Sequence, residues 1–385
     1  MNKYWLDLAN ESSVPNAYQF GSDFLMNRTG QNVGNFVFRK AVSSLLDNVS
    51  DFQLLGWSKA KNVVFDDNSE IIISCANWLG MSDKDEQSNL TRAKVVENLS
   101  GKCIVLGLGS QASSGQELSF GPNTCRLARA LSSKTTALSV RDLNTANALR
   151  GLGITNVVVT GCPSNFINTQ LTKDLFERNY LQKSTSWRTA KLFISEASGG
   201  NPLSGKVVKR MLSILSQSPG SRYVLQSPQL LKYLYRESDI FPAFYERAID
   251  SSPQIAKAII KNSSQVFSSV DEWLFSASFH DLSFGMRIHG TMIPLQAGVP
   301  SVLIAHDKRT SGLASTMSIP SLSCDQFLDS QAFPSPFSFL ELFMDNLDAY
   351  FARRYELAFV FKELIEANGF QVSDSFSKLC QVTRR

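Results

Sequence analysis

Residues 281–310 read DLSFGMRIHGTMIPLQAGVPSVLIAHDKRT, and this stretch decides the fold that the sequence predicts. The apolar residues 282–286 indicate a strand, residues 291–297 a short helix that follows Gly290, and residues 301–305 a second strand. A strand, a helix and a second strand form the unit of a parallel α/β sheet. Ligands of open sheets bind beyond the carboxyl ends of the strands, and a helix that begins there attracts anions. The stretch therefore predicts a ligand site to which Gly290 contributes a backbone donor.

Basic side chains and histidines follow both of these predicted strands. Arg287 and His289 come after the first strand, and an extended backbone would point side chains two residues apart to the same side. His306, Lys308 and Arg309 come after the second strand, and all three histidines of the chain lie in or beside the stretch. A single arginine or histidine at a strand end is more often structural. The clustering, however, favours a site for an anionic ligand.

The composition is that of a globular protein without a nucleic-acid partner. The 385 residues suffice for two domains, and a net charge of +4 is too small to indicate binding to nucleic acid. No apolar run reaches the length of a membrane span and the N-terminus lacks a signal-peptide core, so we expect a cytoplasmic protein. The six cysteines are scattered without CxxC spacing, which indicates reduced thiols.

Apolar strands alternate with helical segments over most of the chain, which predicts parallel sheets with covered faces. Residues 1–30 have an irregular pattern, residues 181–189 have the polarity of a linker, and after Pro320 the alternation stops. The other predicted strands are 70–74, 102–106, 135–140, 157–160, 192–195, 223–226 and 265–267. The predicted helices include 36–46, 143–152, 203–216, 229–235, 241–260 and 271–277, and residues 338–367 are expected to form one or two long helices.

This pattern predicts an α/β, GT-B-like fold. Two Rossmann-like parallel-sheet domains would face a cleft that holds the site, and the C-terminal helices would cross back. The predicted boundaries are 1–183 for the N-terminal domain, 184–334 for the C-terminal domain, and 335–385 for helices that pack back on the N-terminal domain.

Three residues of the N-terminal half are further candidates for the site. Asn32, in the run Asn-Val-Gly-Asn, either caps a helix or faces the cleft. Gln111 ends a glycine loop that fits G-x-G-x-x-A, but no helix opens directly after it, which disfavours dinucleotide binding. Arg141 ends a predicted strand and either binds an anion or pairs with Asp142.

We expect neither a metal nor a cofactor. The histidines lack a spacing that would place two of them on one helical face. Ser164 lies outside the G-x-S-x-G context of a nucleophile elbow.

The run FGMRIHG at 284–290, followed by AGVP at 297–300 and by Asp307-Lys308, resembles the C-terminal signature of the polysaccharide pyruvyl transferase family. The resemblance covers residues 30–320. Many members have an aspartate where this chain has Asn35 and Cys162, which leaves the acceptor open. Weaker matches occur upstream in the order of that family, at NVGN 32–35, GLGSQ 107–111, SVRD 139–142 and TGCPS 160–164.

The resemblance implies transfer of a pyruvyl group from phosphoenolpyruvate to two hydroxyls of a sugar, with formation of a cyclic ketal and release of phosphate. The saccharide acceptor, free or lipid-linked, would lie on the N-terminal domain, and phosphoenolpyruvate, a co-substrate, on the C-terminal domain. Arg287, Lys308 and Arg141 are the expected cations for the donor. His289 is the expected proton donor, with a pKa that a nearby anion should raise. His306 is a weaker candidate for the same site.

Two other functions stay open on the residues alone. One is a nucleotide-sugar glycosyltransferase of GT-B architecture, although no ribose-binding carboxylate stands out beyond Glu272 and Asp281. The other is a non-catalytic sugar-binding α/β protein. Residues 350–361, YFARRYELAFVF, combine aromatic residues with a basic pair. They either pack back across the first domain, which is the favoured interpretation, or lie at the inner face of the membrane.

Overall fold

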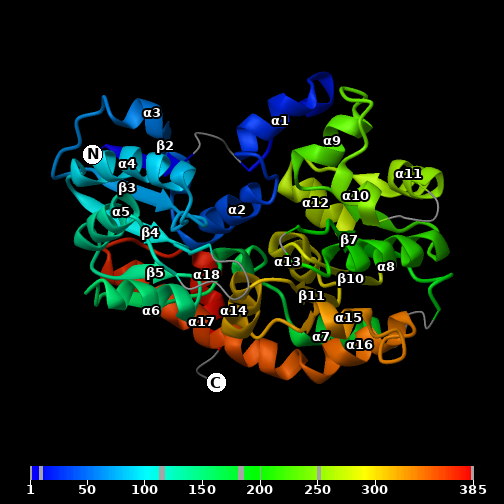
Figure 1. Cartoon of the computed structure of the whole chain (residues 1–385). Helices are drawn as coiled ribbons and strands as arrows, with labels where there is room; N and C mark the ends of the chain where they lie inside the picture. The colour runs from blue at the N-terminus through cyan, green and yellow to red at the C-terminus, as the bar shows by residue number, and fades with distance from the viewer. Residues whose placement is uncertain are drawn as a thin grey trace.

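A computed structural model describes residues 2–7, 12–111, 118–180, 186–199, 201–248 and 253–382 (Figure 1). All strand pairs within its sheets are parallel, as the sequence predicts. The strands are β1 (Lys3–Asp7), β2 (Gln53–Gly56), β3 (Glu70–Ser74), β4 (Lys102–Leu106), β5 (Leu138–Val140), β6 (Val157–Val159), β7 (Leu192–Ser195), β8 (Arg222–Val224), β9 (Ser264–Gln265), β10 (Leu282–Gly285), β11 (Ser301–Ala305) and β12 (Ser321–Ser323).

The first sheet has the order β2-β1-β3-β4, and the pair β5-β6 continues it through a parallel bridge between Leu108 and Val140. The central strand β1 lies within residues 1–30, so the expectation of an irregular N-terminus is wrong. β1 is ordered by its partners: the indole Nε1 of Trp5 donates to Ser74 Oγ at 2.8 Å, and Asp7 forms a buried ion pair with Arg39. Partners that are distant in the sequence leave no signal in the strand itself.

The second sheet has the order β12-β11-β10-β7-β8-β9. Its inner strands are buried along nearly their whole length, which is why they appear as apolar runs in the sequence. β12 extends the sheet beyond Pro320, so the alternation does not stop there as predicted. With only Leu322 buried in its run Ser-Leu-Ser, this edge strand has little hydrophobic pattern.

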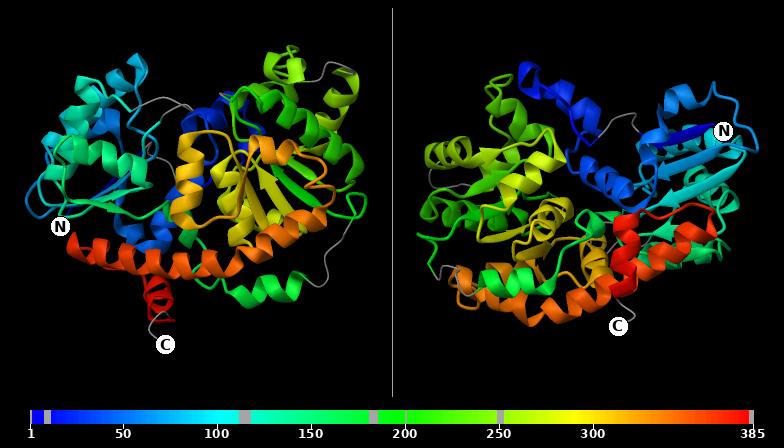
Figure 2. Two further views of the ribbon diagram at one scale, coloured as in Figure 1. Left: turned by 60° about the horizontal axis from the view of Figure 1, so that its bottom comes forward. Right: turned by 180° about the vertical axis from the view of Figure 1, so that it is seen from behind.

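Helices cover both sheets (Figures 1 and 2). They are α1 (Ser22–Thr29), α2 (Asn35–Leu45), α3 (Trp57–Ala60), α4 (Asp83–Glu97), α5 (Pro122–Ser133), α6 (Leu143–Gly151), α7 (Lys173–Tyr180), α8 (Ser204–Gln217), α9 (Pro228–Leu234), α10 (Ala243–Ala248), α11 (Pro253–Ser263), α12 (Val270–Ala277), α13 (Ile288–Gln296), α14 (Lys308–Met317), α15 (Cys324–Leu328), α16 (Pro336–Asp345), α17 (Leu347–Ala367) and α18 (Asp374–Val382).

Helix α2 connects the two sheets. Arg39 binds Asp7 of the first sheet at 2.7 Å, while Phe36 and Val37 belong to a hydrophobic cluster with Phe193 of the second sheet. Removing either member of a buried ion pair leaves an uncompensated charge, which is strongly destabilising. The N-terminal end of α2 is therefore fixed in position between the two sheets.

The C-terminal helices return to the first sheet. Figure 2 shows α17 running beneath both sheets, and Asn368, just after it, accepts a hydrogen bond from Thr136 N at 2.9 Å. Tyr350 and Phe361 of α17 are fully buried, and Arg354 beside them donates to Asn168 O. The apolar face of this helix is thus covered by protein, which contradicts its alternative assignment to a bilayer surface.

No helix of the described residues is long and apolar enough to cross a membrane. The fold is α/β and GT-B-like, with parallel sheets in two units and returning C-terminal helices. The domain boundaries at 183 and 334 stay a prediction. The cysteines are free, as predicted, and five of the six are buried.

Candidate active site

Helix α13 begins earlier than the sequence predicts. Arg287 is its N-cap, so His289 and Gly290 lie in its first turn, and the argument from an extended backbone is wrong. Gly290 does not open the helix. A Cβ at this position would collide with Ser195 and would lie 2.6 Å from Gln226 Nε2. Glycine therefore allows α13 to approach β7 and the loop after β8 closely.

His289 is buried where three elements meet. Its Nε2 lies 3.6 Å from Cys162 Sγ, in the loop after β6, and its ring lies 6.1 Å from that of Phe38 in α2. Burial, together with the positive charges of Arg141 and Arg309, lowers the pKa of His289 to about 3. Without a ligand, the ring is therefore neutral at pH 7. The increase in pKa predicted from the sequence would need a bound anion.

Three arginines from different strand ends form a cluster here, and two of them, Arg141 and Arg309, act on the His289 ring. Arg141 follows β5, Arg287 follows β10, and Arg309 lies in the first turn of α14, after β11. Burial lowers the pKa of Arg309, and the positive charges of Arg287 and Arg141 lower it as well, whereas Asp307 raises it. Like charges that perturb one another in this way lie close together. The structure thus brings Arg141 to the strand ends of the second sheet, where the sequence places Arg287.

The guanidinium of Arg141 donates its hydrogen bonds to neutral oxygens. Its Nη1 donates to Asn77 Oδ1 at 3.3 Å and its Nη2 to the carbonyl of Cys75 at 3.2 Å, so the expected alternative pairing with Asp142 is not the contact that it makes. Asp142 instead caps α6. A Cβ at Gly109 would lie 3.1 Å from both Arg141 Cδ and Asn77 Oδ1, which explains the glycine of this loop.

Two of the arginines have a buried N–H group without a hydrogen-bond acceptor. Within the described ranges, the buried Nε atoms of Arg141 and Arg287 make no hydrogen bond. A buried guanidinium N–H without an acceptor is costly, and an anionic ligand would satisfy it.

Glu196, after β7, was not predicted from the sequence. Its buried carboxylate accepts from the backbone N–H of Gln226 at 2.8 Å and of Ser227 at 2.9 Å, and lies 3.8 Å from Arg287 Nη2. It thereby holds the loop after β8 and the guanidinium together. The preceding strand gives no hint of this role, because the carboxylate's partners follow in the sequence only after a helix and a second strand.

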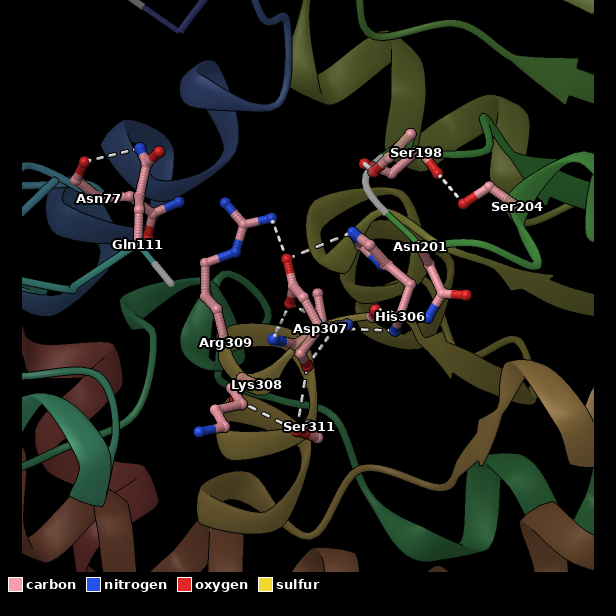
Figure 3. A network of polar contacts seen from close by, with 12 residues as sticks. Asn77, Gln111, Ser198, Asn201, Ser204, His306, Asp307, Lys308, Arg309 and Ser311 are labelled. Atoms are coloured by element: carbon pink, nitrogen blue, oxygen red, sulfur yellow. Dashed lines mark hydrogen bonds and ion pairs between the residues drawn. The ribbon is translucent and has the colours of Figure 1, made fainter. Parts of the chain in front are cut away.

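Figure 3 shows the residues after β11. Arg309 Nη2 donates to Asp307 Oδ2 at 3.2 Å, and His306 Nε2 lies 3.4 Å from the same oxygen. Burial lowers the pKa of His306 to about 4 despite the opposing effect of Asp307. Lys308 is exposed, and its side chain extends away from Asp307 and the Arg309 guanidinium. By position, Arg309 rather than Lys308 belongs to the arginine cluster.

Gln111 and Asn32 each lie next to a residue that contacts the site. Gln111 is exposed and donates to the carbonyl of Asn77, whose side chain binds Arg141 (Figure 3). Asn32 Oδ1 accepts from Gly34 N at 2.8 Å, and a Cβ at Gly34 would lie 3.0 Å from His289 Nδ1. The run that opens α2 therefore faces the histidine. The N-cap of α2 is Gly34, without a side-chain cap hydrogen bond, so the interpretation of Asn32 as a helix cap is wrong, and its role in the site stays a prediction.

The described residues contain no group of three or more His, Cys, Asp or Glu side chains that could hold a metal ion. The site is instead a cluster of cationic side chains near a neutral histidine, with amide and backbone groups beside it. Such an arrangement suits a small ligand with several negative charges.

Solved structures resemble the chain in outline. An uncharacterized protein from Klebsiella pneumoniae subsp. pneumoniae is 8% identical, with 82% of this chain and 87% of that chain covered and a TM-score of 0.39. A Listeria monocytogenes protein assigned as a UDP-N-acetylglucosamine 2-epimerase is 12% identical, with 88% and 81% covered and the same TM-score. A TM-score of this size supports no conclusion about function.

No curated protein matches the chain by sequence. A family model does match it. The model is that of the polysaccharide pyruvyl transferases and spans residues 20–308, which include Arg141, Arg287 and His289 but end one residue before Arg309. The chain belongs to the polysaccharide pyruvyl transferase family.

Proposed function

We propose that this enzyme transfers the pyruvyl group of phosphoenolpyruvate to two hydroxyls of a saccharide, forming a cyclic ketal and releasing phosphate. Family membership supports a pyruvyl transferase acting on a polysaccharide or its precursor. The proposed donor is supported by Arg141 and Arg309 beside His289, together with Arg287, which lies close to Arg309. This arginine cluster is the observation that carries the proposal.

The charge of the donor fits that of the cluster. Phosphoenolpyruvate carries a carboxylate and a phosphate, and forked guanidinium groups bind both with paired hydrogen bonds. Arg287 and Arg309 each have a carboxylate nearby, Glu196 and Asp307, whereas the hydrogen bonds of Arg141 go to neutral oxygens. The site therefore retains positive charge for a trianionic ligand. The dianionic diphosphate of a nucleotide sugar would also be attracted, so binding of the two donors must be compared.

The proton balance of the reaction assigns a role to His289. The donor methylene gains one proton and becomes a methyl group, while the two acceptor hydroxyls lose two. One of these protons is returned to the histidine and the other leaves with the phosphate. A bound trianion offsets the charges of Arg141 and Arg309, which raises the pKa of His289 and allows it to act as the acid. The phosphate leaves from carbon, so the scheme includes no cofactor.

The acceptor is a saccharide, and we propose that it is carried on a lipid or on a growing chain at the cytoplasmic face of the membrane. Because the apolar face of α17 is buried, the contact with such an acceptor is assigned to the sugar rather than to an inserted helix. Asn32 and Gln111, at the edges of the cluster, are the candidate acceptor contacts on the N-terminal side.

Two measurements test the proposal. Release of phosphate from phosphoenolpyruvate should depend on an added free or lipid-linked oligosaccharide. Phosphoenolpyruvate should also raise the melting temperature of the protein more than UDP- or GDP-sugars do, because a ligand of the folded state stabilises it by mass action. Stabilisation by the nucleotide sugars alone, with no effect of millimolar phosphoenolpyruvate, would refute the proposed donor and favour a glycosyltransferase.

A further inference from the structure

We propose that Cys162 is a positioning residue for His289: its S–H donates to Nε2, which keeps the ring proton on Nδ1, the nitrogen on the side of Gly34. The consequence for catalysis rests on the proposed function. The pairing itself does not.

The position of the Cys162 thiol allows it to contact the His289 ring but not a substrate. Cys162 is fully buried, so its sulfur is inaccessible to a substrate, and the distance from Sγ to His289 Nε2 is 3.6 Å. Its backbone is fixed as well, since its N–H donates to Met317 Sδ at 3.3 Å and the preceding Gly161 has φ of 75°. A side chain at 161 would be strained in this conformation and would meet Met317. The loop after β6 therefore holds the sulfur at a defined position against the imidazole.

The other ring nitrogen has acceptors on its side. A Cβ added at Gly34 would lie 3.0 Å from His289 Nδ1, 2.8 Å from Gln226 Oε1 and 2.9 Å from Asn32 Oδ1. Amide oxygens accept hydrogen bonds, and a neutral imidazole presents one donor and one acceptor. A thiol donor at Nε2 makes this nitrogen the acceptor, which leaves the ring proton on Nδ1. The proposed tautomer thus places the ring N–H on the side of Gly34, Asn32 and Gln226.

The charges around the ring explain why a thiol beside His289, rather than a carboxylate, affects the protonation state of the imidazole. Arg141 and Arg309 act on the ring from the ends of β5 and β11. The carboxylate of Asp307 contacts Arg309 and His306. Burial and these arginines keep the imidazole neutral, with a pKa of about 3. A neutral thiol leaves this balance unchanged, whereas a carboxylate would favour the imidazolium. Protonation of His289 is thereby coupled to the arrival of an anionic ligand.

Nitrogen NMR of the full chain labelled with ¹⁵N-histidine tests the pairing directly. The chain has only three histidines, and His289→Gln identifies the signals of His289 by their loss. Nε2 couples to both ring carbon-bound protons and Nδ1 to one, so the two nitrogens are distinguished without reference to activity. We expect His289 in the unliganded protein to carry its proton on Nδ1, with Nε2 as an acceptor. A proton on Nε2 would overturn the inference, and this result needs no variant of Cys162 that folds.

Variants of Cys162 add a kinetic test. Cys162→Ala should shift the His289 tautomer signals and lower kcat about five- to tenfold, the effect of a single neutral hydrogen bond, with the KM for phosphoenolpyruvate little changed. Cys162→Ser should restore part of this loss. Cys162→Asp should move the His289 pKa upward, which the pH dependence of the same NMR signals reports. Unchanged signals in the alanine and aspartate variants would overturn the pairing.

Cys380 offers a matched control, because it is also buried and its Sγ lies 3.5 Å from a backbone carbonyl, that of Ala358. Cys380→Ala should leave the histidine signals in place, and a shift equal to that of Cys162→Ala would count against the assignment. If phosphoenolpyruvate proves not to be the donor, the NMR result still decides the pairing. The two proposals therefore fail separately.

Discussion

The carboxylate of Glu196 lies 3.8 Å from the guanidinium of Arg287, and the same carboxylate oxygen accepts two backbone N–H groups of the loop after β8. Arg287, a proposed donor-binding residue, is thus held next to a buried carboxylate at the end of the neighbouring strand β7. The ends of three adjacent strands, β10, β7 and β8, are fixed relative to one another by this single side chain.

Removing this carboxylate should destabilise the fold. Glu196→Ala leaves the buried N–H groups of Gln226 and Ser227 without their acceptor, and we expect the free energy of unfolding to fall by about 1–3 kcal/mol. Urea denaturation measures it. Glu272→Ala, on the exposed side of α12, is the control and should change the free energy of unfolding little. Equal losses in the two variants would contradict the role of Glu196.

Arg287 should need its forked geometry as well as its charge. Arg287→Lys keeps a cation but loses the paired hydrogen bonds, so phosphoenolpyruvate affinity should fall by about 1.5–3 kcal/mol, the range for a hydrogen bond to a charged group. Isothermal titration calorimetry measures this affinity. A lysine variant that binds the donor as well as the wild-type protein would restrict Arg287 to a structural role.

Arg309 and Lys308 form a matched pair of adjacent cations. Arg309 takes part in the cluster around His289, whereas Lys308 is exposed and extends away from it. Arg309→Gln should therefore weaken phosphoenolpyruvate binding tenfold or more, the effect of about 1.4 kcal/mol, and Lys308→Gln should weaken it much less. The same calorimetric titration tests both variants. A larger loss for Lys308 would restore the assignment made from the sequence.

Stability should depend on pH through the buried histidines. The pKa values of His289 and His306 are lowered to about 3 and about 4, whereas an unfolded histidine titrates near its usual pKa of about 6.5. Below that pH the unfolded chain binds more protons than the folded one, so stability falls as the pH falls toward the folded values, by up to about 1.4 kcal/mol per pH unit for each histidine. Urea denaturation from pH 7 to pH 5 measures the slope.

A His289→Gln variant should remove one histidine's share of this slope, because glutamine does not titrate. His280→Gln is a weaker comparison, since the pKa of His280 is also lowered by burial and its Nδ1 lies 2.9 Å from Ser276 O. A slope unchanged by loss of His289 would mean that this ring is protonated in the folded protein.

The sequence predicts those elements whose own residues determine them. The strands at 70–74, 102–106, 192–195 and 301–305 match β3, β4, β7 and β11, because each is a continuous buried apolar run between polar ends. β1 and β12 were not predicted, for two different reasons. The strand KYWLD is ordered by distant partners such as Ser74, and SLS has a single buried residue.

Among the site residues, too, those with a local sequence signal were predicted and those that depend on distant partners were not. Arg141, Arg287 and His289 are predicted because they end or follow recognisable strands, and carboxyl ends of parallel strands meet at one edge of a sheet. Cys162 and Glu196 have the same kind of position, yet a thiol or a carboxylate after a strand is ambiguous until its partner is known. Cys162 and His289 are 127 residues apart, and only the packing of the loop after β6 on α13 brings them together. The low pKa of His289 likewise depends on burial that no local pattern reveals.

His289 should be required for turnover more than for donor binding. Glutamine at this position keeps a polar side chain but cannot donate and recover a proton at neutral pH, so kcat should fall by about 10²–10⁴, the usual contribution of a positioned acid or base. Phosphoenolpyruvate affinity should be retained, or should increase slightly, because the three arginines remain. Single-turnover ketal formation by His289→Gln, measured beside calorimetric donor affinity on the same preparation, separates the two effects. His306→Gln is the matched variant, since His306 is also buried with a lowered pKa but its Nε2 faces Asp307. Turnover lost in His306→Gln and kept in His289→Gln would transfer the proton role to His306. Lost binding with normal saturated turnover would make His289 a donor-binding group.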